Sequence, residues 1–597
     1  MEPLTLVYPP ALVVLAMSAV WALPRRVGHG LAVGLLAGLA ALAGFVPEGA
    51  HLPVVLFEVF EAELFYVDGP SRLMGVVFGI VGAASVLYAY ASEASAEQTA
   101  IALSYVAVSV GAVFAGDWLA LVFFWELMAV TSTALVWHHG TPTAIRSGYR
   151  YAVLHGIGGS LLLVAVVAQY ALTGTLAYTG EGIVAGLPAL VAAVGIGVNV
   201  GFLGLHTWLP DTYPSPHFAA SVFLSVYTTK TGVYALYRAF PEGQLAIAYM
   251  GGAMALFGAL AAVLQDDMRR MMSYSIQSQV GYMVAAIGVG GALATAGTFA
   301  HVFNHILYKS LLFMVAGVII YRTGVERLRE LGGLATKMPL TAVAFLVGAL
   351  SIAGLPGFSG FVSKGMILKA AHGLNDGNLL WWILLVAGVG TALTLAKFGY
   401  FAFVRGPYTG TVRDATPGQS VAMGTIAALC VGFGLFPDAL YALIPVASAQ
   451  VSAIPLVETV TGIKYTAFTV GHVIEALALA GGGLLALAVL RGPLRQVADV
   501  PDVDWLLTRA SFYGTRGLVI GVTELFGAIG RAAGWLALAG TTIGANPETA
   551  LRQTRFGRWL LRGRSAWAHP LRTGIGESVA LLVAVVTVLL VAVMLAV

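Results

Sequence analysis

The sequence predicts an all-α polytopic membrane protein with about 16 transmembrane helices. Hydrophobic residues make up 59% of the 597-residue chain and charged residues only 10%, whereas soluble domains carry about 25% charged residues. The apolar runs are roughly 18 to 26 residues long, which suits helices crossing about 30 Å of hydrocarbon rather than the short strands of a membrane barrel. Lysine and arginine gather in alternate loops, as they do when those loops face the cytoplasm.

The apolar runs define the predicted spans in chain order. They lie near residues 5–23, 28–46, 71–91, 97–115, 117–137, 148–173, 186–205, 217–240, 246–264, 274–291, 295–320, 339–371, 379–404, 419–446, 467–490 and 574–597. A second run follows the first at once, so we interpret the first as a retained span rather than a cleaved signal. We expect a multi-pass protein of a prokaryotic cell (plasma) membrane, with both termini outside.

Two segments should interrupt their helices. The run 339–371 is too long for one straight span and contains Gly354-Leu-Pro-Gly-Phe-Ser-Gly360, and the loop Leu209–Pro216 holds three prolines before the eighth span. Proline and clustered glycine kink or unwind helices. Because discontinuous helices near mid-membrane are typical of ion and substrate pathways, both places are candidate parts of a transport route.

The C-terminal region changes in composition between Arg491 and Arg572, where arginines alternate with aromatic and aliphatic residues. This pattern predicts an amphipathic helix over about 500–565 on the membrane surface, interrupted at Asn546-Pro547-Glu548. Such a helix either embraces a neighbouring subunit or only anchors the chain in the lipid interface. The sequence favours neither role, and the run 574–597 should form the last span.

The strongest candidate site is a stripe formed by His301, His305 and Lys309. Their four-residue spacing places both imidazoles and the ammonium on one face, along roughly 12 Å of an otherwise apolar helix. Ionisable groups inside a membrane are costly and usually functional, although satisfied core residues are the alternative. The stripe therefore predicts a proton path.

Three further charges lie inside apolar runs, namely Glu126, Lys230 and Lys364. A structural salt bridge would explain each of them alone equally well. Six ionisable groups in one bundle instead favour a relay, because a relay needs groups whose protonation neighbours can change. His155 stands among glycines, and such a histidine more often packs than relays protons.

Several classes of site are excluded. The single cysteine, Cys430, rules out disulfides within the chain and cysteine-rich metal or iron–sulfur sites. A net charge of +3 is too small to indicate nucleic acid as a partner, and the chain contains no phosphate loop or dinucleotide motif. We therefore predict neither a cofactor nor a metal site.

A series of short motifs follows in order from about Asp68 to Lys369. They are Val67–Arg72 (VDGPSR), Phe124–Leu127 (FWEL), Leu205–Asp211 (LHTWLPD), Thr229–Arg238 (TKTGVYALYR), Asp267–Arg270 (DMRR), Tyr274–Tyr282 (YSIQSQVGY), His301–Lys309 (HVFNHILYK) and Leu355–Lys364 (LPGFSGFVSK). Together they resemble the antiporter-like subunits of Mrp-type cation/proton antiporters, respiratory complex I and membrane-bound hydrogenases, and most closely the D-subunit type of the Mrp antiporters.

The resemblance implies a 14-helix antiporter-like core with two inverted five-helix repeats, each containing a broken helix. We assign residues 1–115 to spans 1–4, 116–264 to the first repeat, 265–446 to the second repeat and the core's end, and 447–597 to span 15, the lateral-type helix and span 16. The lateral-type helix resembles one found in the distal complex I subunit and in hydrogenases, and a typical Mrp D subunit lacks it.

The resemblance also implies a role for each buried charge. Glu126 matches the glutamate of the proton-entry half-channel, and Lys230 matches the lysine that feeds the central axis. Lys364 matches the terminal lysine of the exit half-channel, and His301, His305 and Lys309 match the groups that link the two lysines. His206 and Asp211 mark the loop at the first broken helix.

Two positions depart from the family pattern. Asn199 stands where the family has the lysine that pairs with the glutamate matched by Glu126, and Gly204 replaces a proline. Glu126 therefore lacks a counter-charge unless Arg150 or His155 supplies one. Asp117, near the end of the same span, has the wrong sign to help.

These features predict a proton-translocating subunit of a multi-subunit Mrp-like antiporter, which exchanges protons for Na⁺ or K⁺ together with other membrane subunits. The predicted activity is transport rather than catalysis. The lateral-type helix favours an alternative, the same module inside a complex I-like or hydrogenase-type redox complex. Two further alternatives are an inorganic-carbon uptake complex and a scaffold whose channel has decayed at Asn199.

Overall fold

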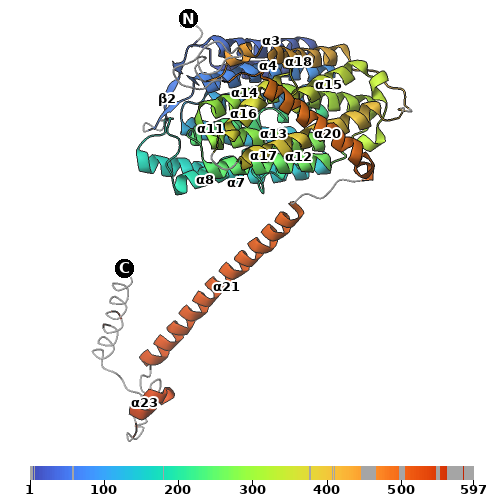
Figure 1. Cartoon of the computed structure of the whole chain (residues 1–597). Coiled ribbons are helices and arrows are strands. Elements are labelled where there is room, and N and C mark those ends of the chain that lie inside the picture. Colours follow the sequence, from blue (N-terminus) through green and yellow to red (C-terminus); the bar gives the residue numbers. More distant parts are fainter. Residues whose placement is uncertain are drawn as a thin grey trace. The chain divides into compact units, whose positions relative to one another are not determined.

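The computed structural model describes residues 5, 7–56, 60–178, 180–374, 378–406, 408, 410–445, 465–496, 504–545, 552–560, 562, 583 and 586. The chain forms two compact units, Met1–Asp502 and Val503–Val597. The first unit is a bundle of helices (Figure 1). The described part of the second unit contains α21 (Asp504–Ala545) and α23 (Arg555–Leu560).

The first half of the bundle consists of long helices joined by short loops: α2 (Pro9–Ala22), α3 (Arg25–Phe45), α4 (Gly69–Ala91), α5 (Ala96–Phe114), α6 (Trp118–Trp137) and α7 (Pro142–Thr173). The loop between α3 and α4 holds four short strands, β1 (Gly49–Ala50), β2 (Pro53–Leu56), β3 (Phe60–Glu63) and β4 (Tyr66–Val67). They pair as β1–β4 and β2–β3, both antiparallel. These strands lie outside the predicted spans, so the membrane part is helical as predicted.

The break predicted at Gly354–Gly360 is confirmed. The one predicted at Leu209–Pro216 is confirmed only in part, because Trp208–Thr212 is helical and the chain is non-helical at 201–207 and 213–217. Helix α8 (Leu187–Val200) ends at Gly201, whose φ of +82° suits glycine, and α9 (Trp208–Thr212) and α10 (Phe218–Leu224) follow as short pieces. Helix α15 (Pro339–Ala353) likewise ends at Gly354 with φ of +79°, and α16 (Ser359–His372) resumes after five residues. A further interruption at residues 225–227, between α10 and α11 (Thr228–Ala239), divides the predicted span 217–240 and was not predicted.

The centre of the bundle is α14 (Gly291–Thr323), whose most apolar stretch is 94% buried. It packs against α4, α10, α13 (Met268–Val289), α15, α16 and α18 (Pro417–Leu435). Around this centre lie α12 (Leu245–Val263), α17 (Leu379–Gly399), its π-helical continuation η3 (Tyr400–Val404), α19 (Pro437–Tyr441) and α20 (Val470–Gln496), with 3₁₀ turns η1 (Leu328–Glu330) and η2 (Leu334–Thr336). The charged stripe thus occupies the core.

The fold class is confirmed, since the described chain is mostly helical and eleven of its helices are long and apolar enough to cross a membrane. The count of 16 spans stays a prediction. Helix α21 falls within the predicted amphipathic stretch, and part of it, Phe512–Thr541, is also apolar enough to span. The surface position of α21 therefore stays a prediction. The predicted cap at Asn546–Glu548 and nearly all of the last predicted span, 574–597, lie outside the described residues.

The two halves of the core repeat one pattern of helix ends. Asp117 and Asp267 cap α6 and α13 by accepting the backbone N–H three residues later. Helices α7 and α14, of 32 and 33 residues, end at Gly174 and Gly324, with φ of +72° and +70°. Both pairs are separated by the same 150 positions. This agreement supports an internal repeat, while the four segment boundaries given above stay predictions.

Candidate functional site

The predicted stripe on α14 is fully buried. His301 Nδ1 lies 2.9 Å from Ser363 Oγ of α16, and its Nε2 lies 3.3 Å from Tyr308 Oη. The ring of His305 is 6.2 Å from that of His301 and 5.4 Å from that of Tyr308. Neither ring nitrogen of His305 has a hydrogen-bond partner among the described residues. The two imidazoles are therefore adjacent, and His305 is free to take or give a proton on either nitrogen.

Lys309 extends the stripe towards α13. Its Nζ donates to Ser275 Oγ at 2.8 Å and to the Met272 carbonyl oxygen at 3.3 Å. No carboxylate forms an ion pair with Lys230, Lys309 or Lys364 in the part of the chain that the structure describes. Neutral dipoles hold a buried ammonium less firmly than a carboxylate would, so its proton is passed on at lower cost.

Lys230 lies just after the interruption between α10 and α11, and its Nζ donates to the carbonyl oxygen of Ser225. The unwound backbone therefore supplies the acceptor that an intact helix would have used internally. The break lies within the predicted span 217–240, and the role that the resemblance implied for Lys230 stays a prediction.

A chain of hydroxyl groups leads to the start of α11. Ser132 Oγ of α6 donates to Tyr151 Oη of α7 at 2.9 Å, and Tyr151 Oη lies 3.1 Å from Thr228 Oγ1. Tyr105 Oη of α5 lies 2.6 Å from the same Thr228 oxygen and accepts the Thr228 N–H. Hydroxyls both donate and accept, so such a chain can pass protons. The sequence did not predict this hydroxyl chain, because tyrosines inside a membrane span commonly serve only as packing residues.

Lys364 lies beyond the second broken helix, and 5% of it is exposed. Its Nζ donates to the carbonyl oxygen of Ile352, which the break at Gly354 leaves available. The ammonium also lies 5.2 Å from the centre of the Tyr282 ring, within the range of a cation–π contact. Asn304 of α14 donates to the Ser359 carbonyl at 2.7 Å and so ties the stripe to the first turn of α16.

Glu126 lies apart from the other charges. Its carboxylate sits against Gly159 of α7, where a Cβ would come within 1.9 Å of Glu126 Oε1. It is half-buried, and Phe123 and Val130 on the same side of α6 are 57% and 65% exposed. No ion pair of Glu126 occurs among the described residues. It therefore lies half-buried between α6 and α7, away from the stripe on α14.

Neither group expected to compensate for Asn199 does so. Arg150 forms an ion pair with Asp211, and His155 hydrogen-bonds with the Tyr151 carbonyl at 2.9 Å while stacking on the Tyr151 ring. His155 thus has the contacts of a packing residue, and an auxiliary role in the relay stays a prediction. Asn199 is 1% exposed, and its side-chain amide has no hydrogen-bond partner in the described chain.

The remaining auxiliary residues have structural contacts. Asp117 Oδ1 accepts the Ala120 N–H, and its other oxygen accepts the Glu63 N–H from the loop before α4. Asp211 also pairs with Arg270 at 3.4 Å, so it joins an ion-pair group rather than the relay. His206 Nδ1 accepts the Gly204 N–H at 3.2 Å, and its ring packs on Phe257.

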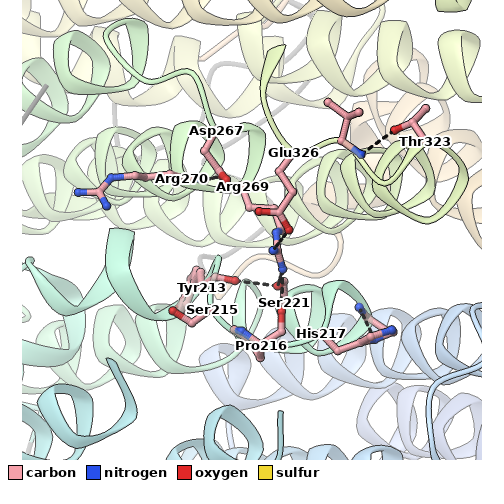
Figure 2. A network of polar contacts seen from close by, with 12 residues as sticks. Tyr213, Ser215, Pro216, His217, Ser221, Asp267, Arg269, Arg270, Thr323 and Glu326 are labelled. Carbon is pink, nitrogen blue, oxygen red and sulfur yellow. Dashed lines mark hydrogen bonds and ion pairs between the residues drawn. The ribbon is translucent and has the colours of Figure 1, made fainter. Parts of the chain in front are cut away.

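A polar network on the side with the basic loops joins the two halves (Figure 2). Arg269, at the start of α13, donates to the Pro216 carbonyl at 2.7 Å and to Glu326 Oε1 at 2.7 Å. Figure 2 shows Arg269 between Glu326 and Ser221. The Arg269 guanidinium therefore fixes the loop between α9 and α10 to the loop after α14.

The chain matches a family model described as NADH:quinone oxidoreductase/Mrp antiporter, TM, over residues 115–394. It is 31% identical over 366 residues to the D-type subunit of the Na⁺/H⁺ antiporter from Alkalihalophilus pseudofirmus, covering 58% of this chain and 73% of that relative. The chain belongs to the NADH:quinone oxidoreductase/Mrp antiporter family. The family match includes Glu126, Lys230, the α14 stripe and Lys364, and excludes α20.

Two solved structures share the fold. A chain of the Mrp complex from Dietzia sp. DQ12-45-1b has a TM-score of 0.64 and 22% identity, and the match covers 74% of this chain and 97% of that one. A chain of the membrane-bound sulfane sulfur reductase, an archaeal respiratory membrane complex, has a TM-score of 0.65 and 22% identity, with coverage of 98% and 99%. The family fold is therefore established, and the second likeness also takes in the C-terminal region.

Proposed function

We propose that this chain is the proton-translocating subunit of a multi-subunit Mrp-like cation/proton antiporter in a prokaryotic cell membrane. The carrying observation is the buried series Lys230, Lys309, His305, His301 and Lys364, which runs through the core without a carboxylate partner in the described chain. Protons pass along this series, and Glu126 with the other membrane subunits completes the route for protons and for Na⁺ or K⁺.

The geometry supports a relay at three places. The interruptions at residues 225–227 and at Gly354 leave the carbonyl oxygens of Ser225 and Ile352 as acceptors for Lys230 and Lys364. The stripe on α14 lies between these ends, with His301 hydrogen-bonded to Ser363 beside Lys364. Each ammonium is therefore held by groups that accept one hydrogen bond and do not lock the proton in place.

The test replaces both terminal lysines in the whole complex. In vesicles that contain the purified complex, we expect Lys230→Ala and Lys364→Ala each to lower proton-coupled cation exchange by about a hundredfold or more, because each removes a proton carrier. Lys337→Ala is the matched control, since Lys337 donates to backbone carbonyls in a loop on the basic side. Exchange that persists in both terminal variants would refute the proposal.

A second candidate is the same subunit in a complex I-like respiratory complex. The observation in its favour is that the likeness to the sulfane sulfur reductase chain covers 98% of this chain, against 74% for the Mrp chain. Purification of the chain with its native partners separates the two: iron–sulfur subunits indicate the redox complex, and small multi-span subunits indicate the antiporter.

A further inference from the structure

A cavity of about 280 Å³ lies where α16 meets α20. Its lining includes Gly365, Lys369, His372, Tyr465, His472 and Glu475. The volume is enough for several water molecules, and the lining offers them polar partners. Lys364 itself is the residue before Gly365 in α16. The relay therefore ends next to a polar space that the relay residues do not use.

The absence of a side chain at Gly365 brings His472 onto α16. A Cβ at that position would come within 1.9 Å of His472 Cε1 and 2.4 Å of Tyr465 Oη. The His472 ring stacks on Phe361, with 4.2 Å between ring centres, and its Nδ1 hydrogen-bonds with the Ala467 carbonyl at 2.8 Å. These two contacts hold the ring in one orientation, and its Nε2 lies on the Gly365 side, 2.3 Å from where that Cβ would be.

Glu475 lies one helical turn after His472, on the same side of α20. Its carboxylate interacts electrostatically with His372 at the end of α16 and with Tyr282 of α13. Tyr282 is the ring that the Lys364 ammonium faces at 5.2 Å. Tyr282 therefore contacts the end of the relay and also lies within range of Glu475.

Exposure rises steadily away from the relay. Lys364 is buried, His472 and Glu475 are half-buried, and Lys369 and His372 are exposed. Four titratable groups thus line one cavity, and Lys364 precedes the cavity residue Gly365 in α16. In the predicted topology this end of α16 and the start of α20 both lie on the outer side of the membrane.

We propose that His472 and Glu475 of α20 form the outlet that passes protons between Lys364 and external water, with Lys369 and His372 at its mouth. This inference rests on the proposed function. A proton leaves Lys364 Nζ for water in the cavity, then binds His472 Nε2 or a Glu475 oxygen, and is released to the bulk. Only N–H and O–H bonds form and break, and each group returns to its starting state. Span 15 is then part of the pathway rather than an attachment to the family core.

The main experiment measures proton-coupled cation exchange of the whole complex in vesicles. We expect Glu475→Gln and His472→Gln each to lower the rate about tenfold, since each removes a proton carrier where water can partly substitute. Glu475→Asp should restore most of the rate with a shifted pH profile, because it keeps a titratable carboxyl group. Ile474→Ala, on the 61% exposed side of α20, is the matched control and should transport normally.

Three results would overturn the outlet. His472→Phe preserves the ring stack on Phe361. A normal exchange rate in this variant would therefore show that His472 acts only in packing. Normal rates in Glu475→Gln, while Lys364→Ala abolishes exchange, would refute the outlet and leave the proposed function intact. If Glu475→Asp loses as much exchange as Glu475→Gln, a carboxyl group at this position is not sufficient and the role of Glu475 is structural. If Lys364→Ala has no effect, the proposed function itself fails.

A second measurement does not depend on transport. Cys430 is the single cysteine of the chain and is buried, so a new cysteine can be labelled selectively. In the intact complex, a membrane-impermeant maleimide should modify Glu475→Cys through the cavity. It should leave Ile474→Cys unmodified, because the exposed side of α20 in the predicted span 467–490 is covered by lipid, which excludes the reagent. Absence of labelling at Glu475→Cys, detected by mass spectrometry of this chain, would show that the cavity is closed to water and would overturn the proposal.

Discussion

The two halves of the core use one helical framework with different chemistry. The 150-position repeat that relates Asp117 to Asp267 and Gly174 to Gly324 also relates α7 to α14. Under this correspondence the α14 groups His301, His305 and Lys309 match residues 151, 155 and 159 of α7, which are tyrosine, histidine and glycine. The second half therefore carries two histidines and a lysine where the first carries a tyrosine, one buried histidine and a glycine.

The third matched position explains how the charges differ. In the second half, Lys309 extends from α14 to Ser275 of α13. In the first half, the matched residue Gly159 has no side chain, and the Glu126 carboxylate from α6 occupies the place where its Cβ would lie. A cation on one helix is thus replaced by an anion from the neighbouring helix. The second half has two buried imidazoles and a buried ammonium on α14, and the first half has a half-buried carboxylate.

The largest expected effect separates the two halves directly. Lys309→Met keeps the length of the side chain and removes its proton, so we expect cation-coupled proton exchange in vesicles to fall about a hundredfold or more. His155→Leu, on the matched helix, should lower the rate by less than about threefold, because His155 hydrogen-bonds with the Tyr151 carbonyl and packs on its ring.

Equal losses in Lys309→Met and His155→Leu would break this comparison, since they would make the first-half histidine a relay member. Size-exclusion profiles of both complexes serve as the control for assembly. The comparison also fails if Lys309→Met retains normal exchange.

The second expected effect concerns the Glu126 position. Gly159→Ala places a methyl group where Glu126 Oε1 now lies, so the carboxylate must turn away from α7. We expect about a tenfold lower exchange rate if Glu126 acts at that place. Gly156→Ala is a matched control on the same helix, because a Cβ there has no atom within 4 Å. A normal rate in Gly159→Ala would show that the position of Glu126 is unimportant for transport.

Sequence reasoning succeeded where the cause was local. Spacing of four residues identified the α14 stripe, and the glycines and proline at Gly354–Gly360 identified the break before Lys364. The break at residues 225–227 escaped because Ser225, Val226 and Tyr227 have no helix-breaking chemistry. This break is stabilised by side chains outside residues 225–227. The Lys230 ammonium donates to the Ser225 carbonyl oxygen, and the Tyr105 hydroxyl accepts the Thr228 N–H.

The other differences between the prediction and the structure arise from contacts between residues distant in sequence. Arg150 was a candidate counter-charge for Glu126, but the fold brings Asp211 to it from the loop at the first broken helix, 61 positions away. His472 and Glu475 lie in an apolar run outside the family motifs, and only the packing of α20 on Gly365 shows that they line a cavity together with the end of α16. A signal was present, since two titratable groups three positions apart in a span merit the same test as the α14 stripe.

The smallest expected effect compares the two capping carboxylates. Asp117 accepts backbone N–H groups with both oxygens, from Ala120 and Glu63. Asp267 accepts the Arg270 N–H with Oδ1. Asparagine offers one acceptor oxygen, so Asp117→Asn leaves a backbone N–H unpaired, at a cost of about 1–3 kcal/mol. Asp267→Asn keeps its cap, because asparagine caps as well as aspartate.

Asp267→Asn should instead change how stability depends on pH. Burial raises the pKa of Asp267 above its ordinary value, opposed by the Arg270 N–H and the Arg269 charge. The folded protein therefore binds this proton more tightly than the unfolded chain, so the contribution of Asp267 to stability is full below its unfolded pKa and is lost as pH rises through the folded pKa. In detergent, we expect the difference in Tm between the wild-type complex and the Asp267→Asn complex to change as the pH rises above about 4. The wild-type Tm should fall relative to that of the variant by at most about 2 °C. A pH-independent difference would show that Asp267 titrates alike in both states, and Asp117→Asn should lower the Tm at every pH.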